Sequence, residues 1–272
     1  MANRIRLFMQ VRKKETIIYK KYFIYFLYIN YSMKILSWNI LADEFIKKRY
    51  YPMIPSDLLL NRKERQNHII TILKHMDMDV MLLQEVMQGE YNALVHTFQK
   101  THHLIRSKNI KWQGKQSSSG NVILLRKSLF QLKESIPLAF GVSLAFGVAV
   151  QCLYKNRPLL ILNIHLDDVA KEKRLEQINT LLPYFSANEQ IIVGGDFNEH
   201  YTTTSELYKI AGLKIMNKKP TYFIEKKMCI DNILIKGIAL KHQSAYVLDS
   251  FGGDVVKQFL TYGSDHLPVA VN

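Results

Sequence analysis

The hydrophobic positions of this chain form two patterns, short apolar runs and longer stretches with helical spacing. The short runs are rich in β-branched residues and end on polar residues, which is typical of buried strands. They predict strands at 33–39, 79–85, 121–125, 145–154, 159–165, 191–195 and 229–235, with a last strand following 263–269. Apolar residues three or four apart predict helices at 62–75, 90–100, 169–185 and 205–210. Strands and helices alternate in both halves, which favours one layered α/β sandwich with mixed sheets.

Glycine and proline mark the expected connections. The sequence Ser-Ser-Ser-Gly at 117–120 predicts a loop, and Asn-Arg-Pro at 156–158 predicts a turn that pairs the strands on either side. In the stretch 191–200, Gly194 and Gly195 are expected to let the backbone turn tightly after the strand. Asp196 and Asn198 would face the same side in an extended chain. The alternative for this stretch is a strand followed by an Asx-turn.

Polar side chains close most of the predicted strands. Taken singly, each could cap a turn, and each histidine could be a satisfied core residue. Taken together, acids and amides from six strand ends could hold a hard divalent cation, and Mg²⁺ is the natural choice because it prefers oxygen ligands. Two histidines and two scattered cysteines suit zinc poorly. The set comprises Asn39, Glu85, His165, Asp196, Asn198, Asp231, Asp265 and His266.

Charge and cysteine content narrow the class of partner. The formal net charge of +14 over 272 residues favours a polyanionic partner, either nucleic acid or an anionic membrane surface. The two cysteines, Cys152 and Cys229, lie in apolar strand-like runs and form neither a disulfide framework nor a metal-ligand cluster. We therefore expect an intracellular protein, cytoplasmic or nuclear and not secreted.

Residues 1–32 are expected to form a basic and aromatic extension preceding a catalytic domain at 33–272. This extension holds seven of the basic residues against one acidic residue, Glu15. Its apolar run at 22–29 is too short to span a bilayer, and it lacks the small-residue cleavage site of a signal peptide. Two alternatives remain for it, a membrane-surface anchor or an extension upstream of a second start at Met33.

Six short motifs, in order, resemble those of the endonuclease/exonuclease/phosphatase superfamily over 33–272. They are Ser37-Trp-Asn-Ile40, Leu83-Gln-Glu-Val86, Asn163-Ile-His-Leu166, Gly195-Asp-Phe-Asn198, Ile230-Asp231 and Ser264-Asp-His266. The resemblance implies a four-layer α/β sandwich in which two mixed β-sheets are flanked by helices. It also implies a Mg²⁺-dependent phosphodiester hydrolase, with Mn²⁺ as a substitute ion.

The same resemblance implies a role for each residue of the set. Metal binding falls to Glu85, supported by Asn39 and Asp265. The remaining residues would be catalytic: Asp196 orients or deprotonates the attacking water, Asn198 hydrogen-bonds the phosphate, His165 and His266 stabilise the transition state, and Asp231 orients His266. Removal of Asp196 or His266 should each cost on the order of 10²-fold or more in turnover.

The N-terminal half resembles the messenger RNA deadenylases (nocturnin- and angel-like) through residues 39–43, 50–52 and 62–65. This resemblance favours a deadenylase-like RNA 3′ exonuclease, and hence RNA rather than DNA as partner. Arg126 is the expected phosphate contact, since it follows a strand that this family places near the site. Phe223 is the expected base-stacking residue. The C-terminal half departs from those enzymes, because the segment 165–168 lacks their usual proline-containing loop.

Three alternatives stay open. The compact length and the segment 165–177 also resemble 5′-tyrosyl-DNA phosphodiesterases and abasic-site endonucleases, which repair DNA. A phosphoinositide or sphingolipid substrate would fit a membrane-binding N-terminus. A non-catalytic nucleic-acid-binding protein would explain the charge equally well, but none of the expected site positions is substituted, which favours catalysis.

Overall fold

The computed structural model describes residues 32–56, 59, 61–107, 111–112, 115–116, 119–140, 146–224, 227–242, 244–249 and 254–272. Every helix and strand named below lies in the unit Lys34–Asn272. The expectations for residues 1–31, and for residues 117 and 118 of the expected loop, fall outside the described residues. Within the described residues, no helix combines the length and apolar character needed to cross a membrane.

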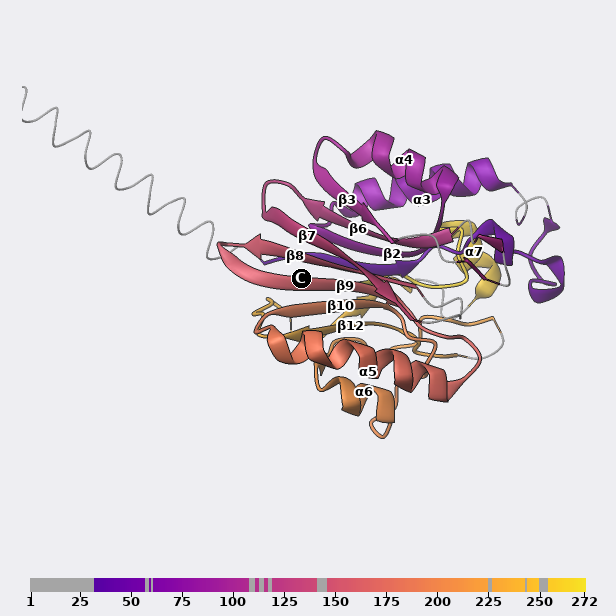
Figure 1. The fold of residues 1–272 in the computed structure, drawn as a ribbon. Helices are drawn as coiled ribbons and strands as arrows, with labels where there is room; N and C mark the ends of the chain where they lie inside the picture. Colours follow the sequence, from indigo (N-terminus) through magenta and orange to yellow (C-terminus); the bar gives the residue numbers. More distant parts are fainter. Residues whose placement is uncertain are drawn as a thin grey trace, which may run out of the picture. The chain divides into compact units, whose positions relative to one another are not determined.

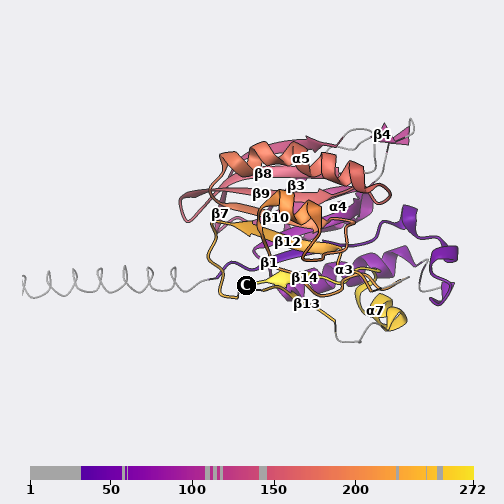
Figure 2. The same ribbon diagram turned by 90° about the horizontal axis from the view of Figure 1, so that it is seen from below.

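Two six-stranded sheets form the centre of this unit (Figures 1 and 2). The first has the order β13 (Tyr246–Val247), β14 (Val269–Val271), β1 (Ile35–Asn39), β2 (Val80–Met87), β6 (Ser119–Arg126) and β3 (His102–Arg106). The second has the order β11 (Lys214–Ile215), β12 (Asp231–Lys236), β10 (Ile191–Asp196), β9 (Arg157–His165), β8 (Phe146–Tyr154) and β7 (Phe130–Ala139). A separate two-stranded sheet pairs β4 (Lys111–Trp112) with β5 (Lys115–Gln116).

Each large sheet contains both parallel and antiparallel pairs. β1 runs parallel to β2, and β10 runs parallel to β9, while the other neighbours in the two sheets pair antiparallel. Because β1, β2, β9 and β10 are buried along most of their length, they carry the continuous apolar runs seen in the sequence. The expected mixed sheets are thus confirmed.

Helices cover the outer faces of the two sheets, which gives four layers (Figure 1). α3 (Arg62–Met76) and α4 (Gln88–Phe98) lie against the first sheet and share one apolar cluster with it. α5 (Lys171–Ala187) and α6 (Glu206–Ala211) lie against the second sheet and share another. α7 (Val255–Tyr262) precedes β14, and two short 3₁₀ helices, Asp43–Phe45 and Lys48–Tyr50, follow β1. The expected four-layer sandwich is confirmed.

Two glycines of β10, Gly194 and Gly195, allow the facing sheet and the neighbouring strand to pack closely against β10. They do not form the expected turn. β10 continues through Gly194 and Gly195 to Asp196 without leaving the extended conformation. A Cβ on Gly194 would collide with Leu82 Cδ1 of the facing sheet, and a Cβ on Gly195 would collide with the carbonyl of Ile164 on the neighbouring strand. The tight turn predicted here was wrong, because the glycines are required by packing between strands and sheets.

A buried polar network joins the two sheets next to these glycines. Gln84 Nε2 donates to Asn163 Oδ1 at 2.7 Å, and Asn163 Nδ2 donates to the carbonyls of Leu83 and Val122, each at 2.9 Å. Asn121 Nδ2 donates in turn to the Asn163 carbonyl at 3.2 Å. These bonds join β2 and β6 of one sheet to β9 of the other, so they fix the register between the sheets.

Other boundaries differ from the sequence prediction for local reasons. The hairpin between β8 and β9 turns at Lys155 and Asn156, with φ of 50° and 62°, rather than at 156–158. Two consecutive positive φ values are typical of the two-residue turn that matches strand twist. Of the expected loop at 117–120, Ser119 and Gly120 instead begin β6. β3, β7 and α7 were not predicted.

Candidate active site

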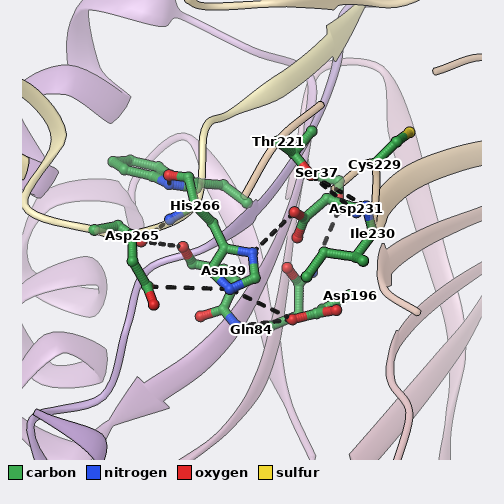
Figure 3. Close-up of polar contacts among 12 residues, drawn as sticks. Ser37, Asn39, Gln84, Asp196, Thr221, Cys229, Ile230, Asp231, Asp265 and His266 are labelled. Carbon is green, nitrogen blue, oxygen red and sulfur yellow. Dashed lines mark hydrogen bonds and ion pairs between the residues drawn. The ribbon is translucent and has the colours of Figure 1, made fainter. Parts of the chain in front are cut away.

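Strand ends from both sheets bring polar side chains to one edge of the sandwich (Figure 3). In the first sheet, Asn39 ends β1 beside Gln84 of β2. In the second sheet, Asp196 ends β10, level with His165 of β9 on one side and Asp231 of β12 on the other. The segment before β14 adds Asp265 and His266 from a third direction.

Glu85 is aimed into this edge by a bulge in β2. The register between β2 and β6 shifts between Leu83 and Val86, and Glu85 adopts a φ of 58°. A non-glycine residue in the left-handed region is strained, and such strain is concentrated at functional sites. The carboxylate accepts the Asn39 amide at 2.9 Å on one oxygen and the Ala42 N–H at 2.8 Å on the other. Burial raises the pKa of Glu85, while His165 and the Asn39 hydrogen bond oppose the rise.

Asn39 connects the two carboxylates at the centre of the site. Its Nδ2 donates to Glu85 Oε1 at 2.9 Å and to Asp196 Oδ2 at 3.1 Å. Its Oδ1 accepts the N–H of Leu41 at 3.0 Å, within a segment where Leu41 has a φ of 58°. Because one amide binds both acids, Asn39 fixes the distance between Glu85, the expected metal ligand, and Asp196, the residue expected to orient the water.

Asp196 lies between two histidines. The Nε2 atoms of His165 and His266 are each 3.7 Å from Asp196 Oδ2. Asp196 is buried, and its other oxygen, Oδ1, accepts the N–H of Asn198 at 2.9 Å. Oδ2 is therefore the atom of Asp196 that faces the imidazoles, which suits it to position a water or accept a proton.

Asn198 reaches the site through a turn rather than through extended chain. Its φ is 48°, and its N–H bonds to Asp196 Oδ1, which is the Asx-turn that the sequence left open as the alternative. Its side-chain amide donates to the Leu166 carbonyl at 3.0 Å, next to His165. The predicted same-side placement by strand period was wrong, because β10 ends at Asp196.

His266 and Asp231 form a buried pair. Nδ1 of His266 lies 2.8 Å from Asp231 Oδ2, and the Thr221 hydroxyl accepts the Asp231 N–H at 3.1 Å. Burial alone would lower the pKa of His266, but the carboxylates of Asp231, Asp265 and Asp196 raise it well above its ordinary value. Burial raises the pKa of Asp231, and His266 opposes this. We therefore assign the positive charge of the pair to the imidazolium, which three carboxylates surround.

Two tyrosines complete the site, and sequence reasoning gave neither of them a role. The Tyr51 hydroxyl donates to Asp265 Oδ2 at 3.0 Å from a largely buried ring. The Tyr222 ring centroid lies 5.1 Å from that of His266. Burial, followed by the charge of Asp265, raises the pKa of Tyr51, so its hydroxyl stays protonated and can donate. The signal for Tyr51 was its place in the deadenylase-like stretch 50–52.

The donor set fits a hard divalent cation. Asn39 bridges the carboxylates of Glu85 and Asp196, and the charge of Asp265 adds to burial in raising the pKa of Glu85. Like charges in low dielectric repel unless a cation is present. Oδ1 of Asp265 is buried and accepts no hydrogen bond from the described part of the chain. Asp265 accepts the Tyr51 hydroxyl, and the charges of Asp265 and Glu85 add to burial in raising the pKa of Tyr51. Oxygen ligands of this kind are those Mg²⁺ prefers.

Among the described residues, a different group, Asp196, Asp231 and His266, brings three ligand atoms within 4.8 Å of one another. The short His266–Asp231 hydrogen bond already occupies the imidazole Nδ1. This cluster is therefore better described as a hydrogen-bonded chain than as the primary cation site, and a metal titration can distinguish the two.

The structure does not bring Arg126 to this edge. Arg126 ends β6, which runs antiparallel to β2, so it lies at the opposite end of the strands, level with Asp79. Its guanidinium binds Asp79 Oδ1 at 2.7 Å and Asp77 Oδ1 at 2.6 Å. Phe223 is half-buried and packs against the apolar cluster of the first sheet, whereas its neighbour Tyr222 contacts His266. The position of Arg126 does not support the expected phosphate contact, whereas base stacking on Phe223 stays a prediction.

Two further arginines hold loops of the site. Arg65, which is buried, donates to the carbonyls of Ile40 and Gly263 at 3.0 and 2.8 Å and pairs with Asp43 at 2.5 Å. These carbonyls adjoin Asn39 on one side and the Asp265 segment on the other. Arg174 pairs at 2.9 Å with Glu199, the residue that directly follows Asn198. Arg65 and Arg174 thus act as structural anchors. The sequence placed them in the family-like stretches 62–65 and 165–177 but did not indicate these contacts.

Comparisons with known proteins bear on the family and the fold of this chain. A sequence model of the Endonuclease/Exonuclease/phosphatase family matches residues 36–266. No curated protein gives a significant match. Among solved structures, the endonuclease/exonuclease/phosphatase from Bacteroides vulgatus aligns with a TM-score of 0.70 at 17% identity, over 89% of this chain and 98% of that chain.

Two other solved structures carry substrate information of their own. ANGEL2, a 2′,3′-cyclic phosphatase, aligns with a TM-score of 0.69 at 17% identity, over 89% of this chain and 94% of that chain. D. rerio TDP2, complexed with a single-strand DNA product, aligns with a TM-score of 0.64 at 17% identity, over 89% of this chain and 98% of that chain. At such identities, the likeness shows a shared fold.

Proposed function

We propose that this chain, which belongs to the endonuclease/exonuclease/phosphatase family, is a Mg²⁺-dependent phosphodiesterase that hydrolyses nucleic acid. The observation that carries the proposal is the placement of Asp196 Oδ2, which receives the Asn39 amide and lies 3.7 Å from the imidazoles of both His165 and His266. A carboxylate so placed can orient a water against a phosphate while the imidazoles face the phosphoryl oxygens.

Each residue then has a defined task in the hydrolysis. Asp196 Oδ2 holds the attacking water and accepts its proton as the new P–O bond forms. The ester P–O bond breaks, and the leaving 3′ oxygen of the shortened strand takes up a proton from solvent. Nε2 of His266 donates to a phosphoryl oxygen, since Nδ1 is held by Asp231. His165 assists from the opposite side. Asn198, whose position is fixed by the Asx-turn, hydrogen-bonds the phosphate.

Glu85 and Asp265 would hold the cation, with Asn39 orienting Glu85. The bound ion supplies Lewis-acid polarisation and neutralises charge on the phosphate. Mn²⁺ should substitute, because it accepts the same oxygen donors. The strained φ of Glu85 and the Ala42 N–H together fix the direction of the carboxylate before any ion arrives.

Single-stranded RNA degraded from its 3′ end is the substrate we favour. The net charge of +14 supports a nucleic-acid partner, and the deadenylase-like stretches 39–43 and 50–52 contribute Asn39 and Tyr51 to the site itself. A DNA-repair substrate is the second candidate, favoured by the fold shared with TDP2. The third candidate substrate is a terminal 2′,3′-cyclic phosphate, favoured by the fold shared with ANGEL2.

One panel of assays tests the proposal. Purified protein is incubated with oligo(A), an oligonucleotide ending in a 2′,3′-cyclic phosphate, a 5′-phosphotyrosyl oligonucleotide and an abasic duplex, each with Mg²⁺ or with EDTA. Mg²⁺-dependent release of nucleoside 5′-monophosphates from oligo(A) is the expected result. The activity should be lost in Asp196→Ala and kept in Asp168→Asn, which alters an exposed acid.

The alternatives give different products. Release of tyrosine or nicking at the abasic site would establish the repair activity, and ring opening alone would establish the cyclic phosphatase. Tight binding of nucleic acid without any hydrolysis would establish a non-catalytic binding protein. Hydrolysis that persists equally in Asp196→Ala would contradict the assigned site.

A further inference from the structure

An exposed aromatic and cationic segment begins next to the catalytic edge. Tyr51 is buried and donates to Asp265, and its ring also lies against Phe259 of α7. The preceding residue, Tyr50, is 48% exposed. Neighbouring Cα atoms are about 3.8 Å apart, so Tyr50 is held only one residue from the anchor that binds the acidic centre.

Cations surround the exposed ring. The guanidinium of Arg49 lies 4.8 Å from the Tyr50 ring centroid and also donates to the Tyr50 hydroxyl at 2.9 Å. The ammonium of Lys47 lies 5.8 Å from the same centroid. Lys48 is tied to the Ile54 carbonyl, which closes the segment on itself. Tyr50 is therefore held in place by cations, while much of its surface stays open to solvent.

Packing alone does not account for this exposure. Met53, three residues on, is 63% exposed, so two large apolar side chains of one short segment face solvent. Tyr51, Ile54 and Leu59 of the same region are buried in a small apolar cluster with Phe259. The segment thus has a buried anchor and an open face, and it forms the indigo loop beside α7 in Figure 1.

We propose that Lys47, Arg49 and Tyr50 form a subsite for the nucleotide that adjoins the scissile phosphate of a single-stranded nucleic acid. The base stacks on Tyr50, and the flanking phosphates bind Lys47 and Arg49. Base–aromatic stacking tolerates any base, and cations beside the ring follow the backbone. The subsite rests on the proposed function, because it assigns the scissile bond to the Asp196 site.

The binding test uses a background that cannot turn over its substrate. Asp196→Asn protein is titrated with a fluorescent oligo(A) and with a single-stranded DNA of equal length, and the anisotropy is followed in Mg²⁺. Adding Tyr50→Leu should raise Kd by about 5- to 150-fold, the range for loss of one stacked base. Replacing Lys47 and Arg49 by alanine should reduce the slope of log K against log salt concentration by about one to two. Tyr246→Leu, at another exposed tyrosine, should leave Kd unchanged.

A kinetic test separates a subsite from a structural role. In otherwise wild-type protein, kcat/KM for oligo(A) is divided by kcat/KM for bis(4-nitrophenyl) phosphate, which carries no neighbouring nucleotide. Tyr50→Leu should lower this ratio about 5- to 150-fold, mainly through KM for the oligonucleotide, whereas Tyr246→Leu should not. Equal loss on both substrates would mean that Tyr50 supports the site itself, and would overturn the subsite.

The remaining outcomes are also decisive. Unchanged oligonucleotide affinity in Tyr50→Leu overturns the subsite even if the protein is an active nuclease. Weakened affinity in a protein that hydrolyses no nucleic acid supports the binding surface and contradicts the proposed function. The last measurement uses vesicles of phosphatidylcholine with phosphatidylserine. If Tyr50→Leu weakened binding to these vesicles but left the oligonucleotide affinity unchanged, the segment would be reassigned to a membrane surface.

Discussion

The Nδ1 atom of His266 lies 2.8 Å from Oδ2 of Asp231, and both side chains are buried. This contact fixes the ring so that Nε2 faces Asp196, 3.7 Å away. An imidazole held in this way presents one defined nitrogen to a substrate, and the carboxylate behind it stabilises the protonated ring.

Replacement of Asp231 by asparagine should therefore lower kcat with little change in folding. The amide can keep a hydrogen bond, but it favours the wrong tautomer and no longer stabilises the imidazolium. We expect kcat to fall on the order of 10²- to 10⁴-fold, as in other carboxylate–histidine pairs. Single-turnover hydrolysis of the substrate identified above measures this, with Asp168→Asn as the matched control. Wild-type kcat in Asp231→Asn would mean that Asp231 does not orient His266.

The charge of His266 can be followed by pH. Because the surrounding carboxylates raise its pKa above 6.5, the folded protein binds this proton more tightly than the unfolded chain does. The resulting stabilisation is complete below the unfolded pKa, about 6.5, and is lost as the pH rises through the folded pKa. In metal-free protein, the NMR signal of the His266 ring should titrate above pH 6.5, and Asp231→Asn should move it to lower pH.

His102 provides the opposite case in the same spectra. Burial lowers the pKa of His102 below its ordinary value, so its ring should titrate below pH 6.5 in both proteins. Assignment by His266→Gln and His102→Gln separates the two signals. If His266 titrated below His102, the carboxylates would not dominate its environment.

Strand periodicity and strand-end polar residues were sufficient to predict the layered fold and the gathering of Asn39, Glu85, His165 and Asp196. Local pattern was enough for these four residues, since each follows an apolar run in its own strand. The strands pair in parallel, β1 with β2 and β9 with β10, so the ends of each pair lie at the same edge of its sheet. Strand direction is not local, so the sequence could not show that Arg126 ends β6 at the far end.

Contacts between distant residues were also beyond the pattern. Tyr51 and Asp265 are 214 positions apart, and Arg65 and Gly263 are 198 apart. The need for Gly195 arises from the carbonyl of a neighbouring strand. Each of these features depends on which surfaces pack together, which periodicity does not specify.

Metal binding should couple to stability through Glu85. Burial raises the pKa of the Glu85 carboxyl, so the folded protein binds this proton more tightly than the unfolded chain does. The resulting stabilisation of the fold is lost as the pH rises through the folded pKa, where Glu85 becomes ionised. At neutral pH and in EDTA, Glu85→Gln should therefore be at least as stable as wild type. Mg²⁺ at a hundred times its Kd should stabilise wild type by about 2.7 kcal/mol and Glu85→Gln far less.

Urea unfolding with and without Mg²⁺ measures both effects, and Glu176→Gln is the exposed control that should respond as wild type does. Equal stabilisation of Glu85→Gln and wild type would contradict the assignment. If Asp231→Asn lost the Mg²⁺ response while Glu85→Gln kept it, the ion would belong to the Asp196, Asp231 and His266 cluster instead.

The two glycines of β10 should differ in their tolerance of alanine. A Cβ at Gly195 meets the backbone carbonyl of Ile164, which cannot move without breaking the strand pair, whereas a Cβ at Gly194 meets the end of the flexible Leu82 side chain. Gly195→Ala should therefore cost about 3 kcal/mol or more, and Gly194→Ala about 1–3 kcal/mol. Gly89→Ala, in α4 with only a 3.7 Å contact to Gln66, should be neutral or stabilising by up to about 1 kcal/mol. Denaturant unfolding of the three variants orders these costs, and equal costs at both β10 positions would contradict the packing argument.

Arg65 should act on catalysis through the two loops that it holds. Its fork donates to the carbonyls of Ile40 and Gly263 and also pairs with Asp43. Lysine offers a single ammonium in place of this planar fork, so Arg65→Lys should release one loop or the other. We expect kcat to fall at least about tenfold in protein that circular dichroism shows to be folded, since small displacements of catalytic groups are costly.

Arg62→Lys is the matched control, because Arg62 pairs with the same Asp43 at 3.0 Å but has a side chain that is 69% exposed. Exposed ion pairs contribute about 0–1 kcal/mol, so this variant should keep its kcat and its stability. Comparison of kcat and KM for both variants at matched stability isolates the geometric effect. If Arg65→Lys and Arg62→Lys behaved alike, the Asp43 ion pair would be the relevant contact, and the two carbonyl hydrogen bonds would not position the site.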